Sequence, residues 1–242
     1  MVETLVKQKY LTVEENGNAV FLERDLPERL EIDVKAGARV KHYRLHGKTD
    51  NALSVKVGRG ASYELVTLHL GGGDLSMSFE LAGEGASCRS DVVYILSGDE
   101  KSVIASNVRH SADKTVSAQL VKGAVGGRGH AAFRGGIYIP YDKKEIDGSQ
   151  QHRALLLSRD ATIEAVPQLE IYADDVKCAH GSAIGTLNRD QLYYMRTRGI
   201  DENDARALLT TAFVNEVLDG IEDGDVRSEF ERLADERLKN EL

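Results

Sequence analysis

Short hydrophobic runs separated by polar turns recur along most of the chain. Gly, Asp or Ser bounds most of them, and each run is too short for a typical helix. The pattern therefore predicts many β-strands joined by tight turns up to about residue 187. The runs cover Leu30–Val34, Leu53–Val57, Tyr63–Leu70, Leu75–Leu81, Asp91–Leu96, Thr115–Val121, Gly136–Ile139, Ala154–Leu157 and Gln168–Tyr172.

A small turn signature repeats between these runs. Gly37-Ala38-Arg39, Gly60-Ala61-Ser62 and Gly85-Ala86-Ser87 follow one another at a nearly constant spacing, and Asp160-Ala161-Thr162 comes three further steps of that size along the chain. A period of about 20–30 residues favours a β-solenoid, in which stacked coils bury one another's hydrophobic faces. Hairpin turns of a β-sandwich also carry Gly-Ala pairs, so periodicity alone leaves both architectures open.

Near Asn188 the pattern becomes helical. Asn188 is expected to cap a helix over Arg189–Arg198 that ends at Gly199, and Asp201 to cap the next helix. The second helix is expected to bury one stripe: Ala205, Leu208, Leu209, Ala212, Phe213, Val217 and Ile221.

A last, highly charged helix follows, marked by Val226, Phe230 and Leu233. It has so little apolar surface that it would be marginal alone, which favours a docking role. The chain is thus expected to comprise an N-terminal segment (1–28), a β core (29–187) and a C-terminal helical domain (188–242).

Composition narrows the classes of function. The 242 residues carry a net charge of −8 with Lys and Arg interspersed among acids, which argues against a nucleic-acid-binding face. No apolar stretch in the sequence resembles a signal peptide or reaches membrane-spanning length. Two cysteines, Cys88 and Cys178, form neither a disulfide framework nor a repeated zinc pattern. We therefore expect a cytoplasmic protein that binds no membrane.

Several motifs in the last third of the chain occur in a recognisable order. They are Phe133-Arg134-Gly135-Gly136-Ile137, Gln150-Gln151, Leu155-Leu156-Leu157-Ser158, Pro167-Gln168-Leu169-Glu170-Ile171, Asp174-Asp175-Val176-Lys177-Cys178-Ala179-His180-Gly181 and Tyr194 followed by Arg198-Gly199-Ile200. This order resembles the C-terminal core of the SufB/SufD family of iron–sulfur cluster assembly proteins. The resemblance is specific over residues 130–221 and looser from 30 to 130.

The resemblance implies a mainly β fold, a right-handed parallel β-helix followed by a small helical domain. It also implies a scaffold rather than an enzyme. Family members dimerise through the β-helix, with themselves or a paralogue, and their helical tails dock on the ABC-type ATPase SufC. A cysteine desulfurase relay supplies sulfide, and an iron–sulfur cluster is built transiently, which we expect at the dimer interface.

The form of the motif resembles SufD more than SufB. SufB carries carboxylates on either side of the histidine, whereas this chain has Cys178-Ala179-His180-Gly181. The position that matches the sulfur-accepting cysteine of SufB, six before Pro167, is Ala161, so this chain cannot accept sulfur there. The chain therefore resembles SufD or an undifferentiated SufB/SufD relative.

Cys178 and His180 are the candidate metal and cluster ligands. Thiolate and imidazole suit iron, and residues two apart on a strand share a face. Asp174 has the same parity and would be a third candidate. Cys-x-His alone is a weak metal signal, because cysteine is often simply buried.

Other polar residues are better explained as structural. Cys88 is expected to be a small core residue, and Gly123–Gly136 a flexible turn that lacks a phosphate-binding lysine. His110, His130 and His152 lie about one coil apart and could stack, as structural or exposed histidines rather than as a metal ladder.

Two other functions remain open. One is a structural dimerisation module without its own cluster. The other is a β-helix enzyme acting on carbohydrate, which would need a groove of aromatic and acidic residues. Asp174 and Asp175 are poor candidates for its acid and base, because adjacent strand residues point to opposite faces.

Overall fold

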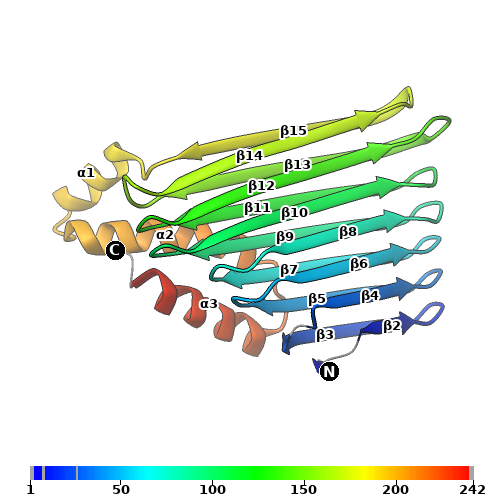
Figure 1. Cartoon of the computed structure of the whole chain (residues 1–242), viewed down its shortest axis with the longest axis horizontal. Coiled ribbons are helices and arrows are strands. Elements are labelled where there is room, and N and C mark those ends of the chain that lie inside the picture. Colours follow the sequence, from blue (N-terminus) through cyan, green and yellow to red (C-terminus); the bar gives the residue numbers. More distant parts are fainter. Residues whose placement is uncertain (1–2, 7–8, 26, 240–242) are drawn as a thin grey trace.

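The computed structural model describes residues 3–6, 9–25 and 27–239. Its described part contains two sheets in which every neighbouring pair of strands is parallel, followed by three helices (Figure 1). Successive strands alternate between the sheets, so each strand pairs with the strand two places further along the chain. The arrangement is therefore mainly β with a helical C-terminal region, as the sequence predicts.

The first sheet has the strand order β1-β3-β5-β7-β9-β11-β13-β15, and the second has β14-β12-β10-β8-β6-β4-β2. The strands of the first sheet are β1 (Glu3–Val6), β3 (Asn18–Asp25), β5 (Arg39–His46), β7 (Ser62–Leu70), β9 (Ser87–Leu96), β11 (Val116–Val125), β13 (Lys144–Leu156) and β15 (Asp175–Gly185). Those of the second are β2 (Tyr10–Val13), β4 (Arg29–Val34), β6 (Asn51–Val57), β8 (Leu75–Leu81), β10 (Lys101–His110), β12 (His130–Ile139) and β14 (Thr162–Ile171).

The sheets extend further toward the N-terminus than residue 29, where the β core was expected to begin. Strand β3 pairs in register with β5, with Phe21 opposite His42, and thus continues the first sheet. The hydrophobic runs there are short and carry no copy of the Gly-Ala signature, which explains why the pattern does not reveal these strands.

The Gly-Ala signature marks turns that enter the first sheet. Gly37, Gly60 and Gly85 have φ values of +69°, +60° and +71°, and the alanine after each is buried. These turns stack, since the Gly37 amide donates to the Arg59 carbonyl and the Gly60 amide to the Glu84 carbonyl. Glycine favours this left-handed conformation, which Asn16 and Lys114 adopt in the equivalent turns of neighbouring coils.

The fourth copy, Asp160-Ala161-Thr162, is not equivalent to the other three. Thr162 begins β14, so this turn enters the second sheet and not the first. The coils also lengthen along the chain, because the in-register partners Gln150 and His180 are further apart in sequence than the partners His42 and Leu65. The apparent continuation of the early spacing as far as Asp160 is therefore a coincidence.

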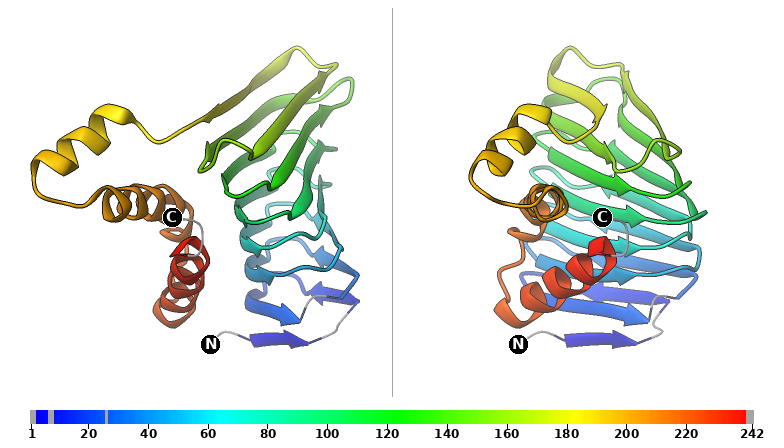
Figure 2. Two further views of the ribbon diagram at one scale, coloured as in Figure 1. Left: turned by 60° about the vertical axis from the view of Figure 1, so that its left-hand side comes forward. Right: turned by 90° about the vertical axis from the view of Figure 1, so that its left-hand side faces the viewer.

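The main hydrophobic core lies between the two sheets. It combines side chains such as Val40 and Tyr63 from the first sheet with Leu53 and Phe79 from the second. A second core covers the outer face of the first sheet, where Leu68 and Val93 pack against Val217 and other residues of the last two helices. The helices therefore attach to one side of the β region (Figure 2).

Helix α1 (Arg189–Thr197) is capped by Asn188, whose Oδ1 accepts from the amides of Asp190 and Gln191. Helix α2 (Glu202–Leu218) is capped by Asp201, and helix α3 (Gly224–Lys239) follows. These starts agree with the predicted caps. Helix α1 has no buried residue and lies apart from the sheets (Figure 2).

Two details of the helical region differ from the expectation. The buried face of α2 includes Val214 and Leu218, whereas Leu208 from the predicted stripe is 53% exposed. Helix α3, expected to be poor in apolar contacts, buries Val226, Phe230, Ala234 and Leu238 on the chain's own sheet. In both helices, packing against the first sheet decides which apolar side chains become buried.

Within the described residues, no helix is long and apolar enough to cross a membrane.

Candidate metal-ligand site

Cys178 and His180 lie on β15, the edge strand of the first sheet. Their side chains share a face because they are two residues apart. In the register with β13, Cys178 lies opposite Gly148 and His180 opposite Gln150. Cys178 is half-buried and His180 is exposed, so the predicted pair lies where a metal ion can reach it from solvent.

The Cys178 thiol is fitted closely against the neighbouring strand. A Cβ atom at Gly148 would lie 3.2 Å from its Sγ, so the absence of a side chain at Gly148 makes room for the sulfur. Burial raises the pKa of Cys178, and Asp147 adds to this rise, while a hydrogen bond from the Gly148 backbone opposes it. The free thiol is therefore protonated near neutral pH, and a metal would have to displace that proton.

His180 opens into a hollow of about 320 Å³ between β13 and β15. The hollow is lined by Ser149, Gln150, Gln151, His152, Arg153, Ala179, His180, Gly181, Ser182 and Ala183. Cys178 is not among the lining residues, so its thiol borders this space and does not face into it. Imidazole is therefore the main metal-binding group that the hollow offers.

Beneath the hollow, His152 is held between the sheets by specific contacts. Its Nε2 pairs with the Tyr94 hydroxyl at 2.9 Å and its Nδ1 with the Ser182 hydroxyl at 3.1 Å, and its ring stacks on Phe133. Burial lowers the pKa of His152 to about 4, so the ring is neutral at physiological pH. Both ring nitrogens are already engaged, which leaves His152 unsuited to bind a metal.

The three histidines that lie about one coil apart do not stack. His110 is buried between the hydroxyls of Thr115 and Ser117, whereas His130 pairs with Thr162 at the start of its strand. Each is a local structural residue, in agreement with the preferred interpretation. Their sequence spacing resembles one coil, but their positions along the strands differ.

The remaining candidates do not join the site. Asp174 precedes β15 and is exposed, and no group of three or more His, Cys, Asp or Glu side chains in the described part of the chain could hold a metal ion. Cys88 is buried in the core, as expected, and burial raises its pKa far above the ordinary value. Of the segment Gly123–Gly136, only residues 126–129 form a turn; the rest belongs to β11 and β12.

A buried polar cluster on β3 and β5, toward the N-terminal edge of the first sheet, was not predicted. Arg44 is fully buried, its Nε donates to Glu23 at 2.6 Å, and His42 also lies next to Glu23. Burial works to raise the pKa of Glu23, but His42 and Arg44 together hold it below the ordinary value. In the sequence these residues look like the solvent-facing half of an amphipathic strand. They lie several strands from His180. Their role is structural, and they are not part of the candidate site.

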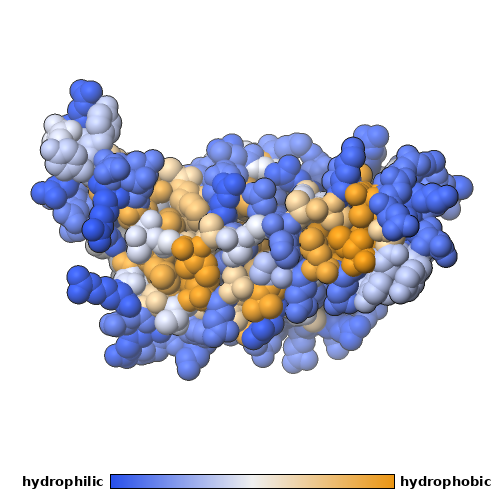
Figure 3. Space-filling view, turned by 90° about the horizontal axis from the view of Figure 1, so that it is seen from above, coloured by the Kyte–Doolittle hydropathy of each residue, from blue (hydrophilic) through white to orange (hydrophobic). Residues whose placement is uncertain are grey.

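The strands at the C-terminal edge of both sheets have only one neighbour each within the described residues: β15 pairs with β13, and β14 with β12. Hydrophobic side chains are uncovered there, with Val166 and Ile184 each 40% exposed. Seen from that side, hydrophobic groups form a band flanked by hydrophilic ones (Figure 3). Long, unpaired edges of this kind can pair with another chain.

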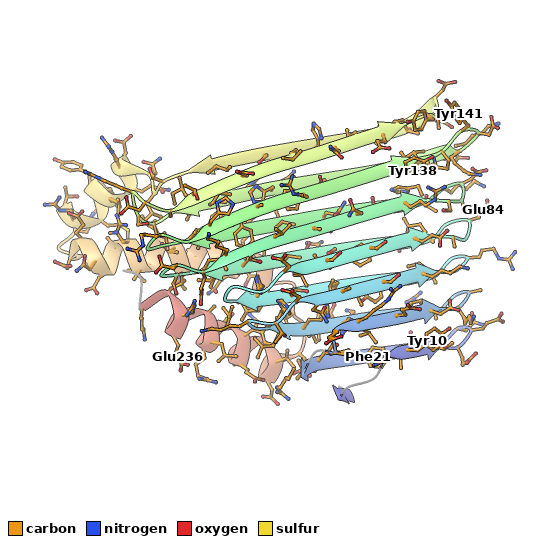
Figure 4. The ribbon with its side chains drawn as sticks, in the orientation of Figure 1. Tyr10, Phe21, Glu84, Tyr138, Tyr141 and Glu236 are labelled. Carbon is orange, nitrogen blue, oxygen red and sulfur yellow. The ribbon has the colours of Figure 1, made fainter. Side chains whose placement is uncertain are left out.

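A tyrosine cluster lies at the end of the sheets away from the helices, where Tyr138 and Tyr141 are found (Figure 4). The Tyr172 ring lies 5.1 Å from that of Tyr141 and 5.9 Å from that of Tyr138, and Arg109 stacks on Tyr138. The adjacent hollow has one acidic lining residue, Glu170. Glycoside hydrolysis ordinarily uses two carboxyl groups, so this cluster lends little support to a carbohydrate enzyme.

Fold and site together describe a class: a protein of two parallel sheets with a helical tail, whose candidate histidine and thiol lie two residues apart on an uncovered edge strand. The family model described as "SUF system FeS cluster assembly, SufBD core domain" matches residues 4–213. The chain belongs to this family of iron–sulfur cluster assembly proteins.

Matches to individual relatives support this family assignment. The chain is 30% identical over 220 residues to the iron–sulfur cluster assembly protein SufD of Escherichia coli, covering 87% of this chain and 51% of that protein. It is 32% identical over 202 residues to an iron–sulfur cluster assembly SufBD family protein of Synechocystis, covering 79% and 44%. A chloroplastic protein of Arabidopsis thaliana is 31% identical over 208 residues, covering 83% and 44%. The chain thus spans about half the length of these relatives.

Proposed function

We propose that this chain is a SufD-like scaffold subunit for iron–sulfur cluster assembly and is not itself an enzyme. In this proposal the two parallel sheets are the faces of a right-handed parallel β-helix, and residues 188–242 form a separate helical domain. The two cysteines are free, which fits the reducing cytosol. The iron and sulfide of the cluster are cargo that the protein assembles and passes on.

The observation that carries the proposal is the position of His180 and Cys178 on an uncovered edge strand. Two ligands are too few for a cluster, which usually takes four protein ligands. A second chain pairing along β14 and β15 would supply further ligands and cover the exposed hydrophobic band. That second chain is another copy or a SufB-like paralogue, and the transient cluster forms between the two.

The helical tail supplies a surface for the ATPase partner. Leu208 and Ala207 of α2, with Leu238 of α3, line a hollow of about 410 Å³. Leu208 is 53% exposed, although it belongs to an otherwise apolar helix stripe. In our proposal a SufC-type ATPase docks on this tail, and a cysteine desulfurase relay delivers the sulfide.

The test is anaerobic co-expression with the SufC-type ATPase and the SufB-like paralogue from the same source, followed by analysis of iron and acid-labile sulfide in the purified complex. We expect His180→Ala to lower the iron and sulfide content by about tenfold or more while leaving the complex assembled. His130→Ala, which removes a half-buried imidazole on β12 in the second sheet, serves as the control and should have no effect.

An alternative is a structural dimerisation module without its own cluster, supported by the absence of a complete ligand set within the described chain. It predicts the opposite result in the same experiment: an assembled complex whose iron and sulfide content is unchanged by His180→Ala. Failure of the chain to associate with either partner would contradict both functions.

A further inference from the structure

A row of buried polar side chains runs beneath His180. Ser90, Gln119 and Gln150 occupy matching positions on β9, β11 and β13, and His180 is the next member on β15. The three buried members are each at most 3% exposed. We call Ser90, Gln119 and Gln150 the polar row. A polar row inside a hydrophobic core requires an explanation, since buried polar groups are normally hydrogen-bonded.

Most of the hydrogen-bonding groups in the polar row are unpartnered. The Gln119 Oε1 accepts from the Ser106 hydroxyl at 2.6 Å. Four other atoms are buried without a partner: Ser90 Oγ, Gln119 Nε2 and both Oε1 and Nε2 of Gln150. Leaving such groups unpaired is costly, and here they all belong to one row that leads to the candidate ligand.

The spacing of the row allows its members to reach one another. In-register residues on neighbouring strands are about 4.8 Å apart, and their side chains stand on the same face. The Gln150 amide occupies space left open by Gly135, where a Cβ atom would lie 2.3 Å from Gln150 Oε1. Gln150 also lines the same hollow as His180. Rotation of these side chains within the row would bring neighbouring groups together.

We propose that Gln150 is a positioning residue that fixes the ring orientation and tautomer of His180. The His180 ring N–H that faces Gln150 donates to its Oε1, and Gln150 Nε2 donates to the second lone pair of Gln119 Oε1. Gln119 Nε2 then donates to Ser90 Oγ. This single arrangement gives a partner to all four unpartnered atoms.

The consequence concerns the other ring nitrogen of His180. With the proton held on the nitrogen that faces Gln150, the nitrogen that faces outward carries the free lone pair. A histidine that binds a metal generally donates its other N–H to a neighbouring acceptor in this way. The inference rests on the proposed role of His180 and adds a residue to the site that the Cys-x-His motif does not contain.

The first experiment needs no metal. Nitrogen-15 NMR of the full chain near pH 8 reports which ring nitrogen of His180 carries the proton. We expect a single tautomer in the native protein, a mixture in Gln150→Leu, and the native tautomer in Gln150→Glu, whose carboxylate accepts the same N–H. Gln151→Leu is the matched control: Gln151 borders the same hollow, but it is exposed and its side chain is on the opposite face of β13 from Gln150. An unchanged tautomer in Gln150→Leu would overturn the inference.

A second measurement, of the melting temperature, tests whether the polar row is hydrogen-bonded in solution. If the row is connected as proposed, Gln150→Leu removes two hydrogen bonds, one with His180 and one with Gln119, and lowers the melting temperature relative to Gln151→Leu. If the four atoms stay unpaired in solution, removing two of them raises the melting temperature instead, and the inference fails.

The third measurement separates the inference from the proposed function. Titration of the full chain with ferrous iron under argon should show an affinity about 10–100-fold weaker in Gln150→Leu than in Gln151→Leu. Loss of the tautomer without any iron binding to the native chain would support the positioning role and contradict the metal role of His180. Iron binding that is equal in both variants would overturn the positioning role alone.

Discussion

At the scale of single residues, local environment decides which of the chemically capable groups can act. Both cysteines could in principle bind iron, yet Cys88 lies in the core and Cys178 at an accessible edge. Histidines divide in the same way: His110 and His152 are buried with both ring nitrogens engaged, and His180 is exposed. Accessibility, and not residue type, singles out Cys178 and His180.

The two thiols should differ in reactivity. Because burial raises the pKa of Cys178, we expect it to react with iodoacetamide at pH 7.5 several-fold more slowly than a free cysteine, and faster as the pH rises. Cys88 should not react until the protein unfolds, since its thiol is fully buried. Mass spectrometry of timed samples measures both rates, and concentrated guanidinium chloride should make them equal. Faster labelling of Cys88 than of Cys178 would contradict the structure.

At the scale of elements, the attachment of α2 to the first sheet includes one buried cation. The Lys122 side chain is 1% exposed and reaches from β11 to α2, where its ammonium donates to the Phe213 carbonyl at 2.9 Å and pairs with Glu216. It also lies over the Phe213 ring at 4.3 Å. Burial lowers the pKa of Lys122, while the Glu216 carboxylate opposes the shift. Hydrophobic packing and this ion pair together hold the tail on the first sheet.

Removing the partner of Lys122 should therefore loosen the tail. We expect Glu216→Gln to lower the free energy of unfolding by about 1–2 kcal/mol, since it leaves a buried ammonium without its carboxylate. Urea denaturation measures the change. The control is Glu229→Gln, which breaks the pair with Arg24; because the Arg24 side chain is 43% exposed and can be hydrated, this change should cost less than about 1 kcal/mol. Equal costs for the two variants would show that Lys122 does not act as a buried cation.

At the scale of the whole molecule, buried neutral histidines link stability to pH. Burial lowers the pKa of His46, His110 and His152 from 6.5 to about 4 and that of His69 to about 3. Between these folded-state values and the ordinary value, the unfolded chain binds protons at these sites and the folded chain does not. The free energy of unfolding therefore falls as the pH decreases through this range.

This linkage can be measured one histidine at a time. Each buried histidine contributes a slope of at most about 1.4 kcal/mol per pH unit. His110→Gln should remove about that much from the pH dependence of unfolding between pH 6 and 4.5. Thr115→Val, which removes a hydrogen-bond partner of His110 without removing a titrating group, should lower stability equally at every pH. An unchanged slope in His110→Gln would rule out His110 as a source of the acid sensitivity.

Local signals in the sequence are enough to predict the mainly β class of this fold and the two candidate ligands. Short hydrophobic runs, the Gly-Ala turns and the caps Asn188 and Asp201 are local signals, because they depend on side-chain alternation and backbone conformation within a few residues. The Cys178 and His180 pair was also visible, since its shared face follows from strand geometry alone. The pattern does not reveal strands β5 and β10, because their polar, inward-facing residues interrupt the hydrophobic runs.

Tertiary structure alone decided which polar residues face inward, which helix face is buried and which strand edge stays uncovered. Ser90, Gln119 and Gln150 are distant from one another in the sequence, and only the register of neighbouring strands aligns them beneath His180. No local pattern encodes that alignment, because it depends on the length of each intervening turn and strand. The physical reason is that register is a relation between distant segments, and it is set by packing of the whole core.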